Sequence, residues 1–315
     1  MDKTVGSKSL MEAQARFTET IRAALLRVPF PGLRQPLYHF TDRAGLEGIL
    51  GTRSLWASLA RALEDTSEIT YALAQARRIL ERHECNSASS LLAEIVPFLD
   101  PQRSRTIDTL GMKTYVVSFC TSLDESALWE THGRSGTGFA LAFAFKPLVI
   151  PGILPLPVLY DPEAQEKLLR EFIETNAKLF DKLSQDCPSE HLWALRQRAV
   201  QWTALGLWTL APVLKDPARF RHEKEWRLIV VDSEHVQVRY GKGLSNEVRR
   251  RRSNNRDIPY KVLEYDSLPI VRLELGPNAP VQENDASLKE LLRYATSGRD
   301  VPITRSQVLI GHHAG

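Results

Sequence analysis

One uncharged segment constrains the fold of this chain more than any other. Residues 138–145 read Gly-Phe-Ala-Leu-Ala-Phe-Ala-Phe, so large and small apolar side chains alternate. Successive side chains of a strand point to opposite faces, which places the phenylalanines and Leu141 on one face and the alanines on the other. A strand that is apolar on both faces is buried on both sides. We therefore predict a central strand in a sheet that is covered on both faces.

Composition sets the class of protein. With 315 residues, 43% of them hydrophobic, the chain can bury a substantial core as one large domain or two small ones. A net charge of +3 does not indicate a nucleic-acid or membrane-surface protein. Cys85, Cys120 and Cys187 are an odd, widely spaced set, which favours a reducing compartment. There is no apolar run of about 18 residues, so we expect no membrane span. We expect a cytoplasmic protein, and secretion without a cleavable signal would leave no trace in the sequence.

Hydrophobic periodicity indicates an irregular mixture of helices and strands. A helix over 8–28 and a linker, together residues 1–32, precede one domain over 33–315. A short helix follows Asp42, a good N-cap, and stops at Gly51. Helical insertions are expected at about 61–98 and 163–207, and a helix at 286–295. Strands are expected at 37–41, 54–58, 115–120, 138–145, 226–231, 260–264, 270–275 and in a last segment ending at 308–310. Helices and strands do not alternate regularly, which favours an α+β fold.

Polar side chains at alternate positions of two segments mark a candidate site. In the strand Leu37–Thr41, His39 shares a face with Thr41, and in the segment 223–227 Glu223 shares one with Glu225. If the two faces converge, a histidine and a hydroxyl lie opposite two carboxylates. Such a cleft can stabilise positive charge that develops on a ligand. The alternatives are a hydrogen-bonded core histidine and an ion pair between Glu225 and Arg227.

Several segments resemble a bacterial family known as domain of unknown function 2971, over most of the chain from Leu37 to Ile310. Departures occur at Glu64, Thr66 and His132, where Asn, Pro and Tyr are usual in the family. The segments that carry the resemblance are Tyr38-His39-Phe40-Thr41, Leu55-Trp56-Ala57-Ser58, residues 63–68, Ser118-Phe119-Cys120, residues 128–133 before Gly138-Phe139, residues 223–227 and Leu275-Gly276-Pro277.

The opening of the chain also looks like that of ADP-ribosyltransferase-fold proteins: a strand with His-x-Thr, a helix and a second short strand. This resemblance implies a split, mixed or antiparallel sheet with helical insertions, and NAD as substrate without a metal. It implies a catalytic role for Glu225, with Glu223 orienting the target as in a Glu-x-Glu loop. It further implies NAD contacts from His39 and Thr41, in a site that also includes Tyr38, Trp56, Ser58, Ser118 and Trp129. For Trp56 and Trp129, packing is the alternative.

The expected activity is transfer of ADP-ribose from NAD to a protein or nucleic-acid acceptor, through an oxocarbenium-like step that a carboxylate stabilises. A bacterial toxin, a secreted effector or a phage-defence protein would fit it. The alternatives are a binding module of the same fold without catalysis, and an NAD glycohydrolase. The run Arg249–Arg252 reads as a solvated loop, with phosphate contacts as the alternative. His83-Glu84-Cys85 and His312-His313 lack the other half of a zinc site.

Overall fold

The computed structural model describes residues 3–29, 32, 35–63, 67–82, 91–100, 112–145, 155–233, 244–245, 247–253 and 255–310. Expectations that fall on residues 64–66, on His83-Glu84-Cys85 and on His312-His313 lie outside these ranges. Among the described helices, none has the length and apolar character that a membrane span requires.

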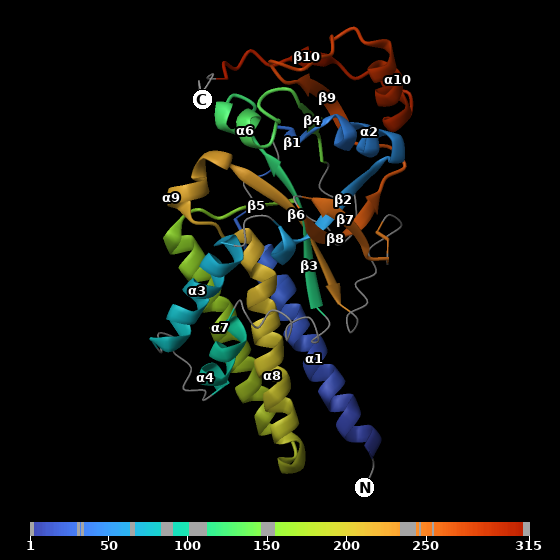
Figure 1. Ribbon diagram of the computed structural model, residues 1–315. Helices are drawn as coiled ribbons and strands as arrows, with labels where there is room; N and C mark the ends of the chain where they lie inside the picture. The colour runs from blue at the N-terminus through green and yellow to red at the C-terminus, as the bar shows by residue number, and fades with distance from the viewer. Residues whose placement is uncertain are drawn as a thin grey trace.

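A mixed, open sheet forms the centre of the protein (Figure 1). The strands follow the order β10-β9-β4-β1-β3-β2-β8-β7, and β6 pairs with both β3 and β5. Only β9 and β10 are parallel among the described pairs. The strands are β1 (Leu37–Thr41), β2 (Ser54–Leu59), β3 (Met112–Cys120), β4 (Phe139–Phe143), β5 (Pro155–Pro157), β6 (Glu225–Ser233), β7 (Arg249–Ser253), β8 (Arg256–Glu264), β9 (Ile270–Leu275) and β10 (Ile303–Arg305).

The alternating strand is central, as the sequence predicts. β4 pairs with β1 on one side and with β9 on the other, and all five of its residues are buried. Phe139, Leu141 and Phe143 belong to an apolar core that includes Leu46 and Leu288 from the helices α2 (Arg43–Thr52) and α10 (Ala286–Ala295).

A helical layer covers a second apolar core on the other side of β3 and β6, where Val116 and Ile229 are buried. The long helices α1, α7 and α8 pack side by side below the sheet in Figure 1. Asp161 caps α7, which has a proline at its first position, and this explains the sharp start of that helix. The layer consists of α1 (Lys3–Leu26), α3 (Ser67–Glu81), α4 (Leu91–Ile95), α7 (Pro162–Gln185) and α8 (Ser189–Leu210).

Several boundaries differ from the sequence prediction. Gly51 does not end α2, which runs to Thr52 and is closed by Arg53 in the left-handed conformation with φ of 51°. The last strand is β10 at Ile303–Arg305, and residues 306–310 form no strand. The run Arg249–Arg252 is the edge strand β7 and not a loop. The sequence also missed β5, α6 (Ser126–Thr131) and α9 (Pro217–Phe220).

Candidate functional site

The sheet opens between β1 and β2, along the middle of β3. β1 pairs with β4 over its full length but shares only one register pair with β3, Tyr38 with Cys120. β2 pairs with β3 through Ser58 and Leu59. The three strands therefore diverge, and a cleft of about 500 Å³ lies where they separate.

Five of the residues that the sequence singled out line this cleft. They come from three strands that are far apart in the chain: His39, Thr41, Trp56, Ser58 and Ser118. The start of α2 forms another wall with Asp42, Gly45 and Gly48. The fold thus brings these five residues together, while their role as ligand contacts stays a prediction.

A hydrogen bond to the backbone of Ser118 on β3 holds His39 at the wall of the cleft. Its Nδ1 lies 2.9 Å from the carbonyl oxygen of Ser118, and a carbonyl only accepts, so Nδ1 carries the proton. Burial lowers the pKa of His39 below its usual 6.5, and the hydrogen bond to Ser118 offsets this in part, while His132 and Arg251 lower it further. At neutral pH the imidazole is neutral, which leaves Nε2 as a hydrogen-bond acceptor.

Two arginines of β7 give the cleft a positive wall. Arg251 donates from Nη2 to Ser58 Oγ at 3.2 Å, and Arg252 lines the same space. Among the described residues neither guanidinium has a carboxylate within ion-pair distance. Asp42 is the one carboxylate among the residues that line the cleft, and it is occupied by the Gly45 amide and by Arg134 Nη2 at 3.0 Å. The cleft therefore favours a negatively charged ligand.

Tyr38 and Trp129 do not line the cleft. Tyr38 points to the other face of β1, where its hydroxyl accepts a hydrogen bond of 2.8 Å from Arg272. Trp129 is fully buried, donates to the carbonyl of Leu123 and packs edge-on against Phe40. Trp129 therefore has the packing environment that the sequence left open as its alternative.

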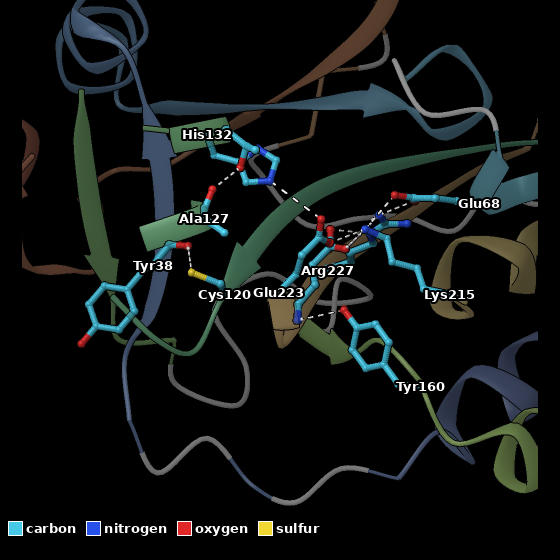
Figure 2. Close-up of polar contacts among 11 residues, drawn as sticks. Tyr38, Glu68, Cys120, Ala127, His132, Tyr160, Lys215, Glu223 and Arg227 are labelled. Atoms are coloured by element: carbon cyan, nitrogen blue, oxygen red, sulfur yellow. Dashed lines mark hydrogen bonds and ion pairs between the residues drawn. The ribbon is translucent and has the colours of Figure 1, made fainter. Parts of the chain in front are cut away.

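Glu223 and Glu225 belong to a second arrangement, a buried ion cluster at the start of β6 (Figure 2). Lys215 Nζ lies 2.7 Å from Glu68, 2.6 Å from Glu223 and 2.7 Å from Glu225. Arg227 contacts both oxygens of Glu225, at 2.7 and 3.0 Å, and Glu68 at 2.6 Å. Three carboxylates thus meet two cations, which leaves the ion cluster with one formal negative charge in excess.

The charges of the ion cluster keep its groups ionised. Burial raises the pKa of the Glu225 carboxyl, but Arg227 and Lys215 outweigh burial and lower it to about 2. Burial likewise opposes ionisation of Glu223, whose pKa is nevertheless lowered by His132 and Lys215. Burial lowers the pKa of Lys215 as well, but the neighbouring carboxylates, Glu225 foremost, raise it above the usual value.

The expected alignment of the two glutamates with His39 is wrong, because the strand pattern begins later than the sequence suggested. Glu223 ends a 3-10 turn (Arg221–Glu223), and Lys224 is left-handed with φ of 46°, so β6 starts only at Glu225. Tyr38, Cys120 and Glu225 are direct partners across β1, β3 and β6. Since direct partners share a face, Glu225 lies on the face of Tyr38 and not on that of His39.

Glu223 is the more accessible of the two carboxylates. Its side chain is 15% exposed, against 6% for Glu225. Its Oε1 lies 4.0 Å from Nε2 of His132, on the side away from Lys215 (Figure 2). His132 lowers the pKa of Glu223 and also that of His39.

Sequence reasoning missed Lys215 and Glu68. It gave phosphate contacts from the run Arg249–Arg252 only as the alternative to a solvated loop. Lys215 and Glu68 are single charges next to apolar segments, and only the fold brings them to Glu225. The described residues contain no group of three or more His, Cys, Asp or Glu side chains placed to hold a metal. Comparisons of the chain with protein-family models, with curated proteins and with solved structures find no match.

Proposed function

We propose that this chain is an ADP-ribosyltransferase that binds NAD in the cleft between β1, β2 and β3. The observation that carries the proposal is the set of groups in that cleft: a neutral histidine, three hydroxyls, an accessible tryptophan and two arginines that have no carboxylate partner among the described residues. NAD offers a matching set of ribose hydroxyls, aromatic rings and a pyrophosphate. The proposed fold type is the split sheet of ADP-ribosyltransferases, with helical insertions.

Each part of NAD has a counterpart in the cleft. Arg251 and Arg252 pair with the pyrophosphate, because a guanidinium binds phosphate oxygens through two parallel hydrogen bonds. Nε2 of His39 accepts from a ribose hydroxyl, and Thr41 and Ser58 supply further hydrogen bonds. Trp56 adds aromatic side-chain surface to the wall of the cleft.

The reaction breaks the bond between C1′ of the ribose and the nicotinamide nitrogen. Nicotinamide leaves with the bonding electrons as a neutral molecule, and positive charge develops on the ribose. An acceptor nucleophile then bonds to C1′ and loses its proton to solvent. The ion cluster supports this step through its excess negative charge, which a fixed and buried carboxylate provides without reorganisation. Glu223 is its more exposed carboxylate, and Glu225 holds Lys215 and Arg227 in place.

The test is nicotinamide release from labelled NAD, with a cell lysate as the source of acceptor. We expect release by the wild type, and a fall of about 10²-fold or more in Glu223→Gln and Glu225→Gln, because each removes a charge from the ion cluster. Glu19→Gln is the matched control, since it removes an exposed carboxylate that pairs with Arg22 on α1.

Folding of each variant is followed by its melting temperature, because Glu225→Gln leaves Lys215 and Arg227 with fewer partners. Glu223→Gln and His39→Ala keep the test decisive if Glu225→Gln does not fold. Full activity in Glu223→Gln and Glu225→Gln would remove the proposed mechanism. Label on macromolecules identifies a transferase, and free ADP-ribose without labelled acceptor identifies an NAD glycohydrolase.

One observation favours a second candidate, a binding module without catalysis. Both oxygens of Glu225 are occupied by cations, and Glu225 does not line the cleft that holds His39. A carboxylate whose two oxygens are both ion-paired is suited to stabilising the fold and not to catalysis. Saturable NAD binding without nicotinamide release, measured by calorimetry on the same protein, would select this candidate.

A further inference from the structure

The edge of the sheet beside the cleft is strongly basic. Between residues 247 and 257 the chain has five arginines and two acidic residues, although the whole chain has a net charge of only +3. Arg249 to Arg252 form the edge strand β7, and all four side chains are exposed. Arg249 and Arg250 extend the positive charge beyond the cleft, whose own lining ends with Arg251 and Arg252. Arg249 lies on the face of Tyr260 and Arg250 on the opposite face, so the two flank the edge of the sheet.

The acidic partners of these arginines are weakly held. Arg249 lies 3.1 Å from Glu247 and Arg250 lies 2.6 Å from Asp257, and every one of these side chains is more than half exposed. Exposed ion pairs contribute little to stability. A phosphate can therefore displace the carboxylate from either guanidinium at small cost.

An aromatic platform lies beside the arginines. Trp56 is 43% exposed, and its ring stacks on Tyr260 with ring centroids 4.4 Å apart and planes 22° from parallel. Arg249 pairs with Tyr260, and Tyr260 pairs with Ser58, so the three lie in one row on the face that also carries Trp56. The sequence could not indicate this neighbourhood, since about two hundred residues separate Trp56 from β7 and β8.

Arginines next to an exposed, rigid indole are the two elements by which proteins bind single-stranded nucleic acid. Guanidinium groups contact the phosphates and the aromatic face stacks on a base. Here both elements adjoin the cleft, because Trp56, Ser58 and Arg251 line it. A single strand of nucleic acid that binds along β7 therefore reaches the cleft in which the ribose of NAD would react.

We propose that the edge surface of β7, with Arg249 on the face of Trp56 and Tyr260 and Arg250 on the opposite face, binds single-stranded nucleic acid, and that this nucleic acid is the acceptor of ADP-ribose. The binding surface is supported by the contacts of the β7 arginines, Trp56 and Tyr260 alone, whereas the acceptor role rests on the proposed function. In the transfer, a nucleophilic nitrogen or oxygen of the nucleic acid bonds to C1′, nicotinamide leaves, and the proton of the nucleophile goes to solvent.

The test compares two double variants in binding of a fluorescein-labelled single-stranded oligonucleotide of about 20 nucleotides, as DNA and as RNA. Arg249→Gln with Arg250→Gln removes two exposed, ion-paired arginines from β7. Arg22→Gln with Arg77→Gln makes the same change of charge at the exposed ion pairs of α1 and α3. We expect the β7 variant to bind about tenfold more weakly and to lower the slope of log affinity against log salt by about 1.4, and the control to match the wild type.

Trp56 provides an independent measurement. Trp56→Ala is expected to weaken binding about tenfold, while Trp56→Tyr retains a stacking ring and most of the affinity. With labelled NAD present, the wild type transfers label to the oligonucleotide, and the β7 variant releases nicotinamide at the wild-type rate but labels the oligonucleotide less.

Equal oligonucleotide binding by the β7 variant and its control would overturn the proposed nucleic-acid binding surface, whatever the result with NAD. Label that appears on lysate protein and not on the oligonucleotide would overturn the acceptor role. If the wild type releases no nicotinamide, the proposed function and the acceptor role that rests on it are overturned. The binding surface is not, because the difference in oligonucleotide binding between the two double variants does not depend on NAD.

Discussion

At the scale of single residues, His39 shows how one side chain combines two alternatives that sequence reasoning treats as exclusive. It is a hydrogen-bonded histidine within a strand, because Nδ1 donates to Ser118, and it also lines the cleft. The hydrogen bond fixes the tautomer, so the cleft receives an acceptor and not a donor. The sequence therefore identified His39 as a candidate site residue, but it did not show which ring nitrogen faces the cleft.

This tautomer predicts how NAD binding depends on pH. The pKa of His39 lies below 6.5, so the imidazole stays neutral above pH 6.5 and its contribution to affinity is constant there. Below that pH, protonation places a hydrogen on Nε2, and affinity falls. We expect His39→Gln to weaken NAD binding about fivefold, as for the loss of one hydrogen bond. Calorimetry at several pH values measures both effects, with His191→Gln on α8 as control. A transition centred between pH 6.5 and 8 in the wild type, absent from His39→Gln, would contradict this assignment.

At the scale of elements, the sequence predicts those strands whose side chains alternate in polarity or size. β1, β2 and β4 were found at nearly their true positions for this reason. β7 was missed because four consecutive arginines have no alternation, although the Asn254-Asn255 pair that follows is a hairpin signal. Asn255 has φ of 61°, and Ser253 pairs with Arg256 across the turn.

The site could be predicted in part for the same reason. Strand phase correctly joined His39 to Thr41, since both lie within β1. It failed for Glu223 and Glu225, because the left-handed Lys224 interrupts the alternation between them. A positive φ at a lysine has no clear signal in the sequence. The sequence therefore predicted, as an alternative, the ion pair of Glu225 with Arg227, but not the rest of the ion cluster.

Helix α2 offers a matched pair of substitutions that tests its role at the cleft. A Cβ added at Gly45 would clash with the hydroxyl of Thr41, whereas a Cβ at Gly51, which does not line the cleft, meets no atom within 4 Å. Gly51→Ala should stabilise the protein by about 0.5–1 kcal/mol through helix propensity, with NAD affinity unchanged. Gly45→Ala should displace Thr41 and weaken NAD binding. Thermal unfolding and calorimetry measure the two quantities, and equal NAD affinity in both variants would exclude Thr41 from the site.

At the scale of the whole molecule, the ion cluster connects the two layers of the fold. Glu68 comes from α3 in the helical layer, while Glu225 and Arg227 belong to β6 of the sheet. Arg227 also donates to the carbonyl of Pro212, and the chain near Lys215 is held by Gln165 of α7. The cleft borders the same strand, β3, that pairs with β6. A change in the ion cluster therefore affects both global stability and the geometry of the proposed NAD site.

Acid unfolding should reveal this connection. Glu225 has its pKa lowered from 4.5 to about 2 in the folded protein, so between these pH values the unfolded chain binds a proton that the folded chain does not. The free energy of unfolding must then fall as pH decreases from 4.5 to 2, by about 3 kcal/mol from this group. Urea unfolding at successive pH values should show the fall in the wild type and in Glu19→Gln.

In Glu225→Gln we expect a protein that is less stable at pH 7 by about 3 kcal/mol or more, because two buried cations lose a shared partner. Its further loss of stability in acid should be smaller than that of the wild type by the contribution of the missing carboxyl. If Glu225→Gln does not fold, Glu223→Gln gives the same comparison, since the pKa of Glu223 is also lowered. An identical decline with pH in the wild type and in the folded variant would mean that the ion cluster does not hold the two layers together.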